Sequence, residues 1–360
     1  MSIGRIFKLS IFGESHGEGI GAVLEGVPAG IAVREEAVKS DMARRMPRGV
    51  TGSTARREPD IPRVLSGIYE GMTTGAPIAM MIENTNTRSQ DYGNLAQLMR
   101  PSHADYTARI KYRGYADMRG GGHFSGRLTA PLVFAGAIAR ELLAAEGVVI
   151  GSHIARIGNV CDAAAEPDRE LLRKLYAMDF PTVSEAAGER MREEVEAARK
   201  EADSVGGGVE TFAVGLPAGL GGPEFDGVES AVSAALFGVS GIKGVEFGAG
   251  FAFAGMRGSS ANDQMEVRNG EAAFLSNNCG GILGGITSGA PLVVRAAFKP
   301  TASIGRKQRT VDMSKMESAQ LVIHGRHDSC IAVRGLAAAE AAVMVALADL
   351  LLIRRSEVAR

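Results

Sequence analysis

The sequence predicts an α/β chain in which one folding unit occurs twice. Apolar residues make up 45% of the 360 residues, which is enough to bury a substantial core. Short strand-like apolar runs alternate with alanine-rich segments typical of buried helices. Two glycine-containing phrases also occur twice, in the same order. These patterns indicate mixed helices and strands and leave the direction of the strands open.

Each repeated phrase precedes an element of the same kind in both halves. The phrase at 26–31 returns at 215–220, and we expect a helix after each, at 34–45 and 227–237. The phrase at 71–78 returns at 285–292, and we expect a strand over 78–82 and over 292–298. Each half then reaches a loop with histidine and aspartate and an alanine-rich helix, at 130–145 and 337–353. We therefore predict two copies of one unit, about 1–150 and 205–360, with a ligand cleft between them.

The segment 151–204 is expected to connect the two copies within a single domain that spans 1–360. Glutamate, arginine and alanine dominate residues 182–203, which predicts a solvated helix. Thr182 and Glu185 have the spacing of a capping box at its start, and the glycines at 206–208 are expected to stop it.

The composition excludes several classes of partner. The formal net charge is −1, 5% of residues are aromatic and tryptophan is absent, so we expect no nucleic-acid partner. The three cysteines are far apart and odd in number, which favours a reducing compartment. The first ten residues lack the apolar stretch of a signal peptide. The apolar run 341–353 is short and contains Asp349, so we interpret it as a core helix, with no membrane association and a cytoplasmic location.

Several common functional motifs are absent or incomplete in the sequence. Glycines at 17, 19 and 21 are followed by a strand-like run and a turn, whereas a dinucleotide fingerprint needs a helix there. A phosphate-binding Gly-Lys-Ser/Thr sequence does not occur. His324 and His327 have metal-compatible spacing but no third ligand nearby, so we expect no metal.

The chain has 47 glycines, about twice the usual share of roughly 7%, and loops rich in glycine carry the remaining candidates. His16 follows a strand-like run, and His103 lies near an aspartate and a tyrosine, so both suit acid–base chemistry. Arginines interrupted by proline and glycine over 44–63 suit carboxylate and phosphate, although a solvated charged face has the same composition. Glycines and serine at 120–125 before a helix form a candidate phosphate cradle. Together they indicate a multiply anionic, phosphorylated substrate beside a phosphate-bearing cofactor and leave the reaction unspecified.

A series of motifs in order, spread over most of the chain, resembles the chorismate synthase family. These motifs occupy residues 13–17, 56–60, 82–85, 88–92, 103–107, 119–122, 280–285, 299–301 and 325–328. The resemblance implies a lyase of the shikimate pathway that makes chorismate by anti-1,4 elimination of phosphate from 5-enolpyruvylshikimate 3-phosphate. It implies a need for reduced FMN without net redox change, because a transient electron from the flavin helps expel phosphate.

The resemblance also implies an α+β fold, a β-α-β sandwich with central helices between two antiparallel sheets, internal pseudo-twofold duplication and assembly as a homotetramer. NADPH is a possible reductant of the flavin.

The resemblance assigns roles to residues of this chain. Catalysis falls to His16, which protonates the leaving phosphate, His103, which protonates or stabilises reduced flavin, and Asp328, which helps remove the ring hydrogen. Substrate anions are expected to bind Ser15, Arg45, Arg48, Arg127 and Arg326. FMN is expected to contact His123, Phe124, Ser125, Ser240, Gly241, Gly284, Lys299, Pro300, Thr301, Ala302, Ser303 and Arg326.

The chain departs from the family pattern at some of these positions. His123 and Phe124 stand where arginine and serine are common, which weakens that FMN contact. Thr51 occupies the place of a family arginine that Arg48 would replace, and Ala302 replaces a serine.

Three other functions are compatible with parts of the pattern. A flavin oxidoreductase would show net hydride transfer. A histidine phosphatase, suggested by residues 324–327, would release phosphate without forming a diene. A non-catalytic nucleotide-binding module would not need His16 or His103.

Overall fold

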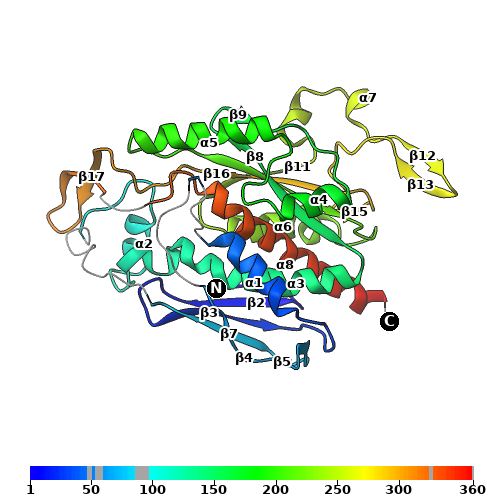
Figure 1. Cartoon of the computed structure of the whole chain (residues 1–360), viewed down its shortest axis with the longest axis horizontal. Helices are drawn as coiled ribbons and strands as arrows, with labels where there is room; N and C mark the ends of the chain where they lie inside the picture. The colour runs from blue at the N-terminus through cyan, green and yellow to red at the C-terminus, as the bar shows by residue number, and fades with distance from the viewer. Residues whose placement is uncertain (47–50, 53–59, 86–96, 324–326, 359–360) are drawn as a thin grey trace.

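The computed structural model describes residues 1–46, 51–52, 60–85, 97–323 and 327–358. Its layers are visible in Figure 1: a first sheet, a layer of helices, a second sheet and an outer helix. Every strand pair in the two large sheets is antiparallel. The mixture of helices with antiparallel sheets confirms the expected α+β class.

The first sheet has the strand order β1-β2-β3-β7-β4. Its strands are β1 (Ser2–Ile3), β2 (Lys8–Gly13), β3 (Gly19–Glu25), β4 (Arg63–Ser66) and β7 (Ile78–Glu83). In β7 every second side chain is buried, at Ile78, Met80 and Ile82, as expected for a sheet with one covered face.

The second sheet has the order β11-β16-β10-β8-β9. Its strands are β8 (Val149–Ile157), β9 (Val160–Cys161), β10 (Gly207–Val214), β11 (Ile242–Phe247) and β16 (Leu292–Phe298). The interpretation of 151–204 as a connector only is therefore wrong in one respect: most of β8, a central strand of this sheet, lies in it. The segment was treated as a link because it lies between the repeated phrases and because 182–203 is rich in glutamate, arginine and alanine.

Two long helices fill the space between the sheets. α3 (Thr129–Ala145) packs on β2, β3 and β7, α8 (Ala332–Val358) packs on β8, β10 and β16, and the two helices pack on each other. They approach so closely that a Cβ on Gly136 would lie 2.5 Å from the Cβ of Ala341. By length and composition, both helices could cross a membrane. However, 78% of the apolar window around α3 and 94% of the apolar window in α8 are buried in the molecule. They are core helices, as expected for 341–353.

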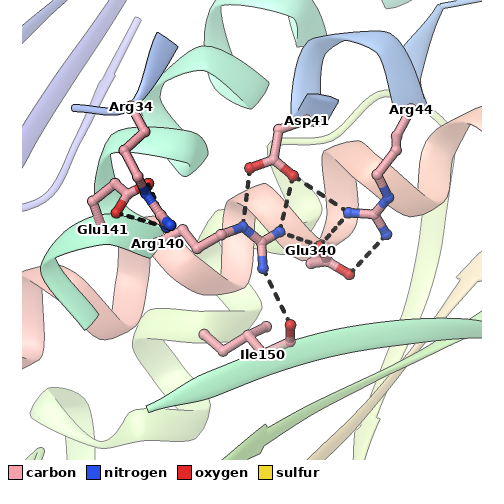
Figure 2. A network of polar contacts seen from close by, with 7 residues as sticks. All are labelled: Arg34, Asp41, Arg44, Arg140, Glu141, Ile150 and Glu340. Atoms are coloured by element: carbon pink, nitrogen blue, oxygen red, sulfur yellow. Dashed lines mark hydrogen bonds and ion pairs between the residues drawn. The ribbon is translucent and has the colours of Figure 1, made fainter. Parts of the chain in front are cut away.

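A buried ion network joins the central helices to α1 (Glu35–Arg45), as Figure 2 shows. Arg140 of α3 donates to Asp41 of α1 at 2.9 and 3.0 Å and to Glu340 of α8 at 2.5 Å. Arg44 donates to the same Glu340 at 2.5 and 3.2 Å. Buried charges are tolerated only when paired in this way, so the network fixes the relative positions of the three helices.

The repeated phrases are joined by the same hydrogen bonds in both halves. Gly30 N donates to Thr73 O at 2.8 Å, and Gly219 N donates to Thr287 O at 2.9 Å. The hydroxyl of Thr73 donates to Pro28 O at 2.6 Å, and that of Thr287 donates to Pro217 O at 2.7 Å. In each half these bonds link the turn after one sheet strand to the hairpin before the next.

The expected helix over 182–203 is α5 (Glu185–Lys200) on the outside of the second sheet. Its N-cap is Ser184, whose hydroxyl accepts from Ala187 N at 3.3 Å, so the prediction of Thr182 as the cap is wrong. Thr182 is buried beside Gly188 instead. The helix ends at Lys200 and is followed by Ala202, which has φ +55°, whereas Gly207 and Gly208 belong to β10 and do not stop it.

The other elements are short. They are β5 (Ile68–Tyr69), β6 (Met72–Thr73), α2 (Asp105–Lys111), η2 (Arg119–Phe124), η3 (Gly126–Leu128), α4 (Arg169–Tyr176), η4 (Glu224–Asp226), α6 (Val228–Phe237), η5 (Gly250–Gly255), α7 (Gly258–Ala261), β12 (Met265–Arg268), β13 (Glu271–Phe274), β14 (Ile282–Leu283), β15 (Ile286–Thr287), β17 (Gln308–Asp312) and β18 (Glu317–Leu321).

Candidate active site

A cavity of about 940 Å³ lies where loops from both halves meet. Its volume is near the upper end of the roughly 300–1,000 Å³ of small-molecule sites, which leaves room for a cofactor and a substrate together. The N-terminal ends of α3 and α8 border it through Thr129 and Arg334. Helix N-termini carry partial positive charge and favour anions.

Nearly all site residues expected from the sequence line this one cavity. These are Ser15, His16, Arg45, His103, His123, Phe124, Ser125, Arg127, Ser240, Gly241, Lys299, Pro300, Thr301, Ala302, Ser303 and Asp328. Gly284 is not among the lining residues and sits in the turn between β14 and β15 with φ +60°. Arg48 and Arg326 lie outside the described residues.

Two buried arginines form one wall of the cavity. Arg45 and Arg127 each donate to Asp60, one to each carboxylate oxygen. Arg45 also donates to Thr129 Oγ1 at 2.9 Å, and Arg127 donates to Asn84 Oδ1 at 2.9 Å. Burial, together with the charges of Arg334 and Arg127, lowers the pKa of Arg45 to about 10 despite the opposing effect of Asp60. The wall thus presents two buried guanidinium groups to the cavity, and guanidinium groups favour anionic ligands.

His16 lies in the loop between β2 and β3. Its Nδ1 is 3.0 Å from Ser15 Oγ, and this hydroxyl donates to Arg119 O at 3.2 Å. The amide of Asn84 donates to Glu14 O at 2.9 Å and to Gly17 O at 3.0 Å. The loop is thus fixed on both sides, and His16 is 8% exposed, at the cavity surface rather than in solvent.

His103 belongs to a second polar cluster. Its Nδ1 lies 2.7 Å from Asp105 Oδ1, and Arg100 holds the same carboxylate with two bonds of 2.7 Å. Burial raises the pKa of Asp105, but hydrogen bonds from Arg100 and His103 outweigh it and hold this pKa well below its usual value. Asp105 therefore stays ionised and orients Nδ1 of the imidazole as the donor.

Asp328 is held on the opposite side by the start of α8. Arg334 Nη1 donates to Asp328 Oδ2 at 2.8 Å, and Arg334 Nε donates to Arg45 O at 3.1 Å. Thr301 Oγ1 donates to Asp328 O at 2.6 Å. Beside it, burial and the charge of Arg100 lower the pKa of His327. Arg334 thus links the aspartate to the arginine wall.

The second half contributes a lysine-rich and apolar wall. Burial and the neighbouring Lys243 lower the pKa of Lys299, and the ammonium group of Lys299 donates to Ser102 O in the His103 loop. Val239, Ile242 and Ile331 add apolar surface nearby. Across the cavity the rings of His123 and Phe124 lie with centroids 4.2 Å apart. This combination suits a flat aromatic ring that carries an anionic group.

Sequence reasoning missed several residues of this site. Asp60 was not among the expected site residues, although it ends the motif at 56–60; it is 3% exposed and is shared by Arg45 and Arg127. Arg334 lies in the first turn of the apolar helix α8, and an arginine at the start of an alanine-rich segment was a signal of a partner there. Arg100 and Asp105 stood in the His103 motif, and only their bonds reveal their effect on the imidazole.

A family model described as chorismate synthase matches residues 7–352. Chorismate synthase of Thermococcus gammatolerans is 48% identical over 98% of both chains, and that of Pyrococcus abyssi is 47% identical over 98% of both. A crystal structure of chorismate synthase superposes with a TM-score of 0.76 at 29% identity and covers 98% of this chain and 93% of that chain. On these matches, the chain belongs to the chorismate synthase family, lyases of the shikimate pathway.

Proposed function

We propose that this cavity binds 5-enolpyruvylshikimate 3-phosphate beside reduced FMN and eliminates phosphate to give chorismate. The observation that carries the proposal is the convergence of His16, His103 and Asp328 on one cavity with an arginine wall. Acid, base and anion-binding groups are the parts that a 1,4 elimination of phosphate needs.

Arg45 and Arg127 bind the anionic groups of the substrate. The substrate has two carboxylates and one phosphate, and both buried guanidinium groups line the cavity. Ser15 adds a hydroxyl at the edge of this wall. Arg48 and Arg326 are proposed to add further contacts. Guanidinium groups favour such oxyanions because they donate paired hydrogen bonds.

The lysine-rich wall fits FMN. Lys299 and Lys243 lie close enough to lower the pKa of Lys299, so a phosphate ester between them would be stabilised. Ser240, Gly241 and the segment 299–303 line the apolar side, and His123, Phe124 and Ser125 line the other. When bound, reduced FMN supplies a transient electron to the substrate. Contacts of FMN with Gly284 and Arg326 remain part of the proposal, as does NADPH as its reductant.

The protein residues then handle protons. His16, with Nδ1 beside the hydroxyl of Ser15, donates a proton to the departing phosphate. His103, oriented by Asp105, holds a proton next to the cofactor. Asp328, held by Arg334, accepts the ring proton.

The sandwich and its duplication are also proposed. The order β2-β3-β7-β4 of the first sheet corresponds to β8-β10-β16-β11 of the second, and the hydrogen bonds of the repeated phrases agree. Two copies around a pseudo-twofold axis, about 1–150 and 205–360 within one domain, account for this. In that pairing β8, which lies before residue 205, takes the place of β2, so the second sheet draws this strand from outside the second copy; β9, α4 and α5 have no counterpart.

A cytoplasmic homotetramer completes the proposal. Large apolar side chains are exposed at Phe225 (91%), Phe251 (83%) and Val267 (79%), which is typical of surfaces that contact other subunits. Light scattering should then give four times the chain mass of 37.6 kDa.

The test is an anaerobic assay with substrate and catalytic reduced FMN. We expect chorismate absorbance and released phosphate in equal amounts without consumption of an oxidant. His16→Ala and His103→Ala should each lower kcat by roughly 10²–10⁴ with an unchanged circular dichroism spectrum. Phosphate without the diene would indicate a phosphatase, and stoichiometric oxidation of the flavin would indicate an oxidoreductase. A second assay with oxidised FMN and NADPH alone tests the reductant.

A further inference from the structure

We propose that Gly120 and Gly121 are positioning residues, Gly120 for the imidazole of His16 and Gly121 for that of His103. The inference rests on the proposed catalytic roles of the two histidines. It replaces the interpretation of this glycine run as a phosphate cradle alone.

Gly120 packs against His16. A Cβ on Gly120 would lie 2.0 Å from His16 Cε1, 2.1 Å from its Nδ1 and 2.7 Å from Ser15 Oγ. Real Cβ atoms do not approach other atoms so closely, so any side chain here would displace the imidazole or break its bond to Ser15. The backbone also favours glycine, since φ is +61°.

Gly121 packs against His103. A Cβ on Gly121 would lie 3.3 Å from His103 Cε1 and 3.4 Å from Nε2, and φ is +94°. Asp105 holds the opposite edge of the ring through Nδ1. The imidazole is therefore confined between a carboxylate and a backbone without a side chain.

The turn that carries both glycines is itself fixed. Gly121 N donates to Met118 O at 2.9 Å, and Ser15 N donates to Gly122 O at 3.2 Å. A Cβ on Gly122 would lie 1.8 Å from Asp117 O, so this third glycine permits the turn to close. Because consecutive Cα atoms are about 3.8 Å apart, one fixed turn holds the two rings at a constant separation.

The test compares Gly120→Ala and Gly121→Ala with Gly114→Ala in the full-length protein. Gly114 has φ +82° and nothing within 4 Å of a Cβ, so it reproduces the backbone strain without an imidazole neighbour. We read the ¹⁵N imidazole signals of the six histidines, assigned with His16→Gln and His103→Gln. Gly120→Ala should shift His16 alone and Gly121→Ala should shift His103 alone, with kcat lower by about 10- to 100-fold in each. Gly114→Ala should shift neither and stay within about twofold of the parent.

Unchanged imidazole signals in both variants, or equal shifts of both histidines in each, would overturn the proposal. If Gly120→Ala folds poorly, its loss of Tm is measured again in a His16→Ala background, where the contacting ring is absent. A smaller loss there supports the contact, and an equal loss contradicts it. The imidazole signals need no turnover, so full activity of His16→Ala and His103→Ala would refute the catalytic roles while leaving the contacts of the glycines intact.

Discussion

Two buried arginine networks lie side by side in this molecule and differ in charge balance. In the core, carboxylates of Glu340 and Asp41 outweigh burial and raise the pKa of both Arg44 and Arg140. At the cavity, burial and other arginines lower the pKa of Arg45 to about 10. The two networks start from consecutive residues of α1. Arg44 pairs with Glu340 in the core, and Arg45 pairs with Asp60 at the cavity.

The comparison distinguishes arginines that pair with acids in the core from arginines that line the cavity. In the core, two arginines meet two acids, and the bonds are made within the protein. At the cavity, Arg45 and Arg127 both pair with Asp60, and both line the space where a ligand would bind. Buried arginines are thus informative about function only when their counter-charges are compared.

The largest expected effect is on stability in the core. Glu340→Gln leaves Arg44 and Arg140 without their shared carboxylate, and we expect a loss of about 3–5 kcal/mol in the free energy of unfolding. Urea unfolding measures it. The matched control is Glu141→Gln, which loses a contact to Arg34, a side chain 68% exposed, and should cost less than about 1 kcal/mol. Equal losses would remove the distinction between the two kinds of pair.

Replacing an arginine of the cavity should affect binding more than folding. For Arg127→Met we expect KM for the substrate to rise by about 10- to 100-fold, because a hydrogen bond to a charged group contributes about 1.5–3 kcal/mol. Asp60 keeps its bond to Arg45, so the loss of stability should be smaller than for Glu340→Gln. Steady-state kinetics and urea unfolding of the same variant give both values, and an unchanged KM would contradict the assignment.

The cluster of Arg100, Asp105 and His103 has features of both networks. The carboxylate of Asp105 is paired within the protein, and the imidazole of His103 lines the cavity. Asp105→Asn should lower kcat by about tenfold, near 1.4 kcal/mol, because the imidazole loses its ionised partner. The pH dependence of kcat should shift as well. A changed KM with an unchanged pH profile would show a structural role only.

The last expected effect is on the pH dependence of stability. Burial raises the pKa of Glu340, but Arg44 and Arg140 lower it to about 2 from its usual 4.5. A lowered pKa in the folded state gives stability that is complete above pH 4.5 and is lost as pH falls towards 2. The free energy of unfolding, measured across this pH range, should fall less steeply with decreasing pH in Glu340→Gln than in the parent protein. The same pH dependence in both proteins would show that other acidic residues cause the loss of stability.

The sequence was informative about elements and motifs, and less so about their partners. The helix over 34–45 is α1 and the strand over 292–298 is β16, because apolar spacing and turns define such elements locally. Histidines in glycine-rich loops were also found, since their chemistry depends on residue type. Strand direction came only from the family resemblance, because a buried apolar run has the same pattern in parallel and antiparallel sheets.

What the sequence could not indicate was contact over long separations. Asp60 meets Arg127 across 67 positions, and Arg334 meets the carbonyl group of residue 45 across 289. The cap of α5 was misplaced by two residues because Thr182 and Ser184 both have a capping hydroxyl. Gly120 was interpreted as ligand-binding because the ring that it contacts lies more than a hundred positions earlier.

The close approach of Gly136 to Ala341 has a consequence for the chemistry. α3 begins two residues after Arg127 and α8 begins four residues after Asp328, so the separation of these helices determines the width of the cavity. We expect a bulky residue at position 136 to push the two helices apart and to change the separation of Arg127 and Asp328 without touching either. Substitutions at this apolar position are then limited by the geometry of the cavity as well as by packing.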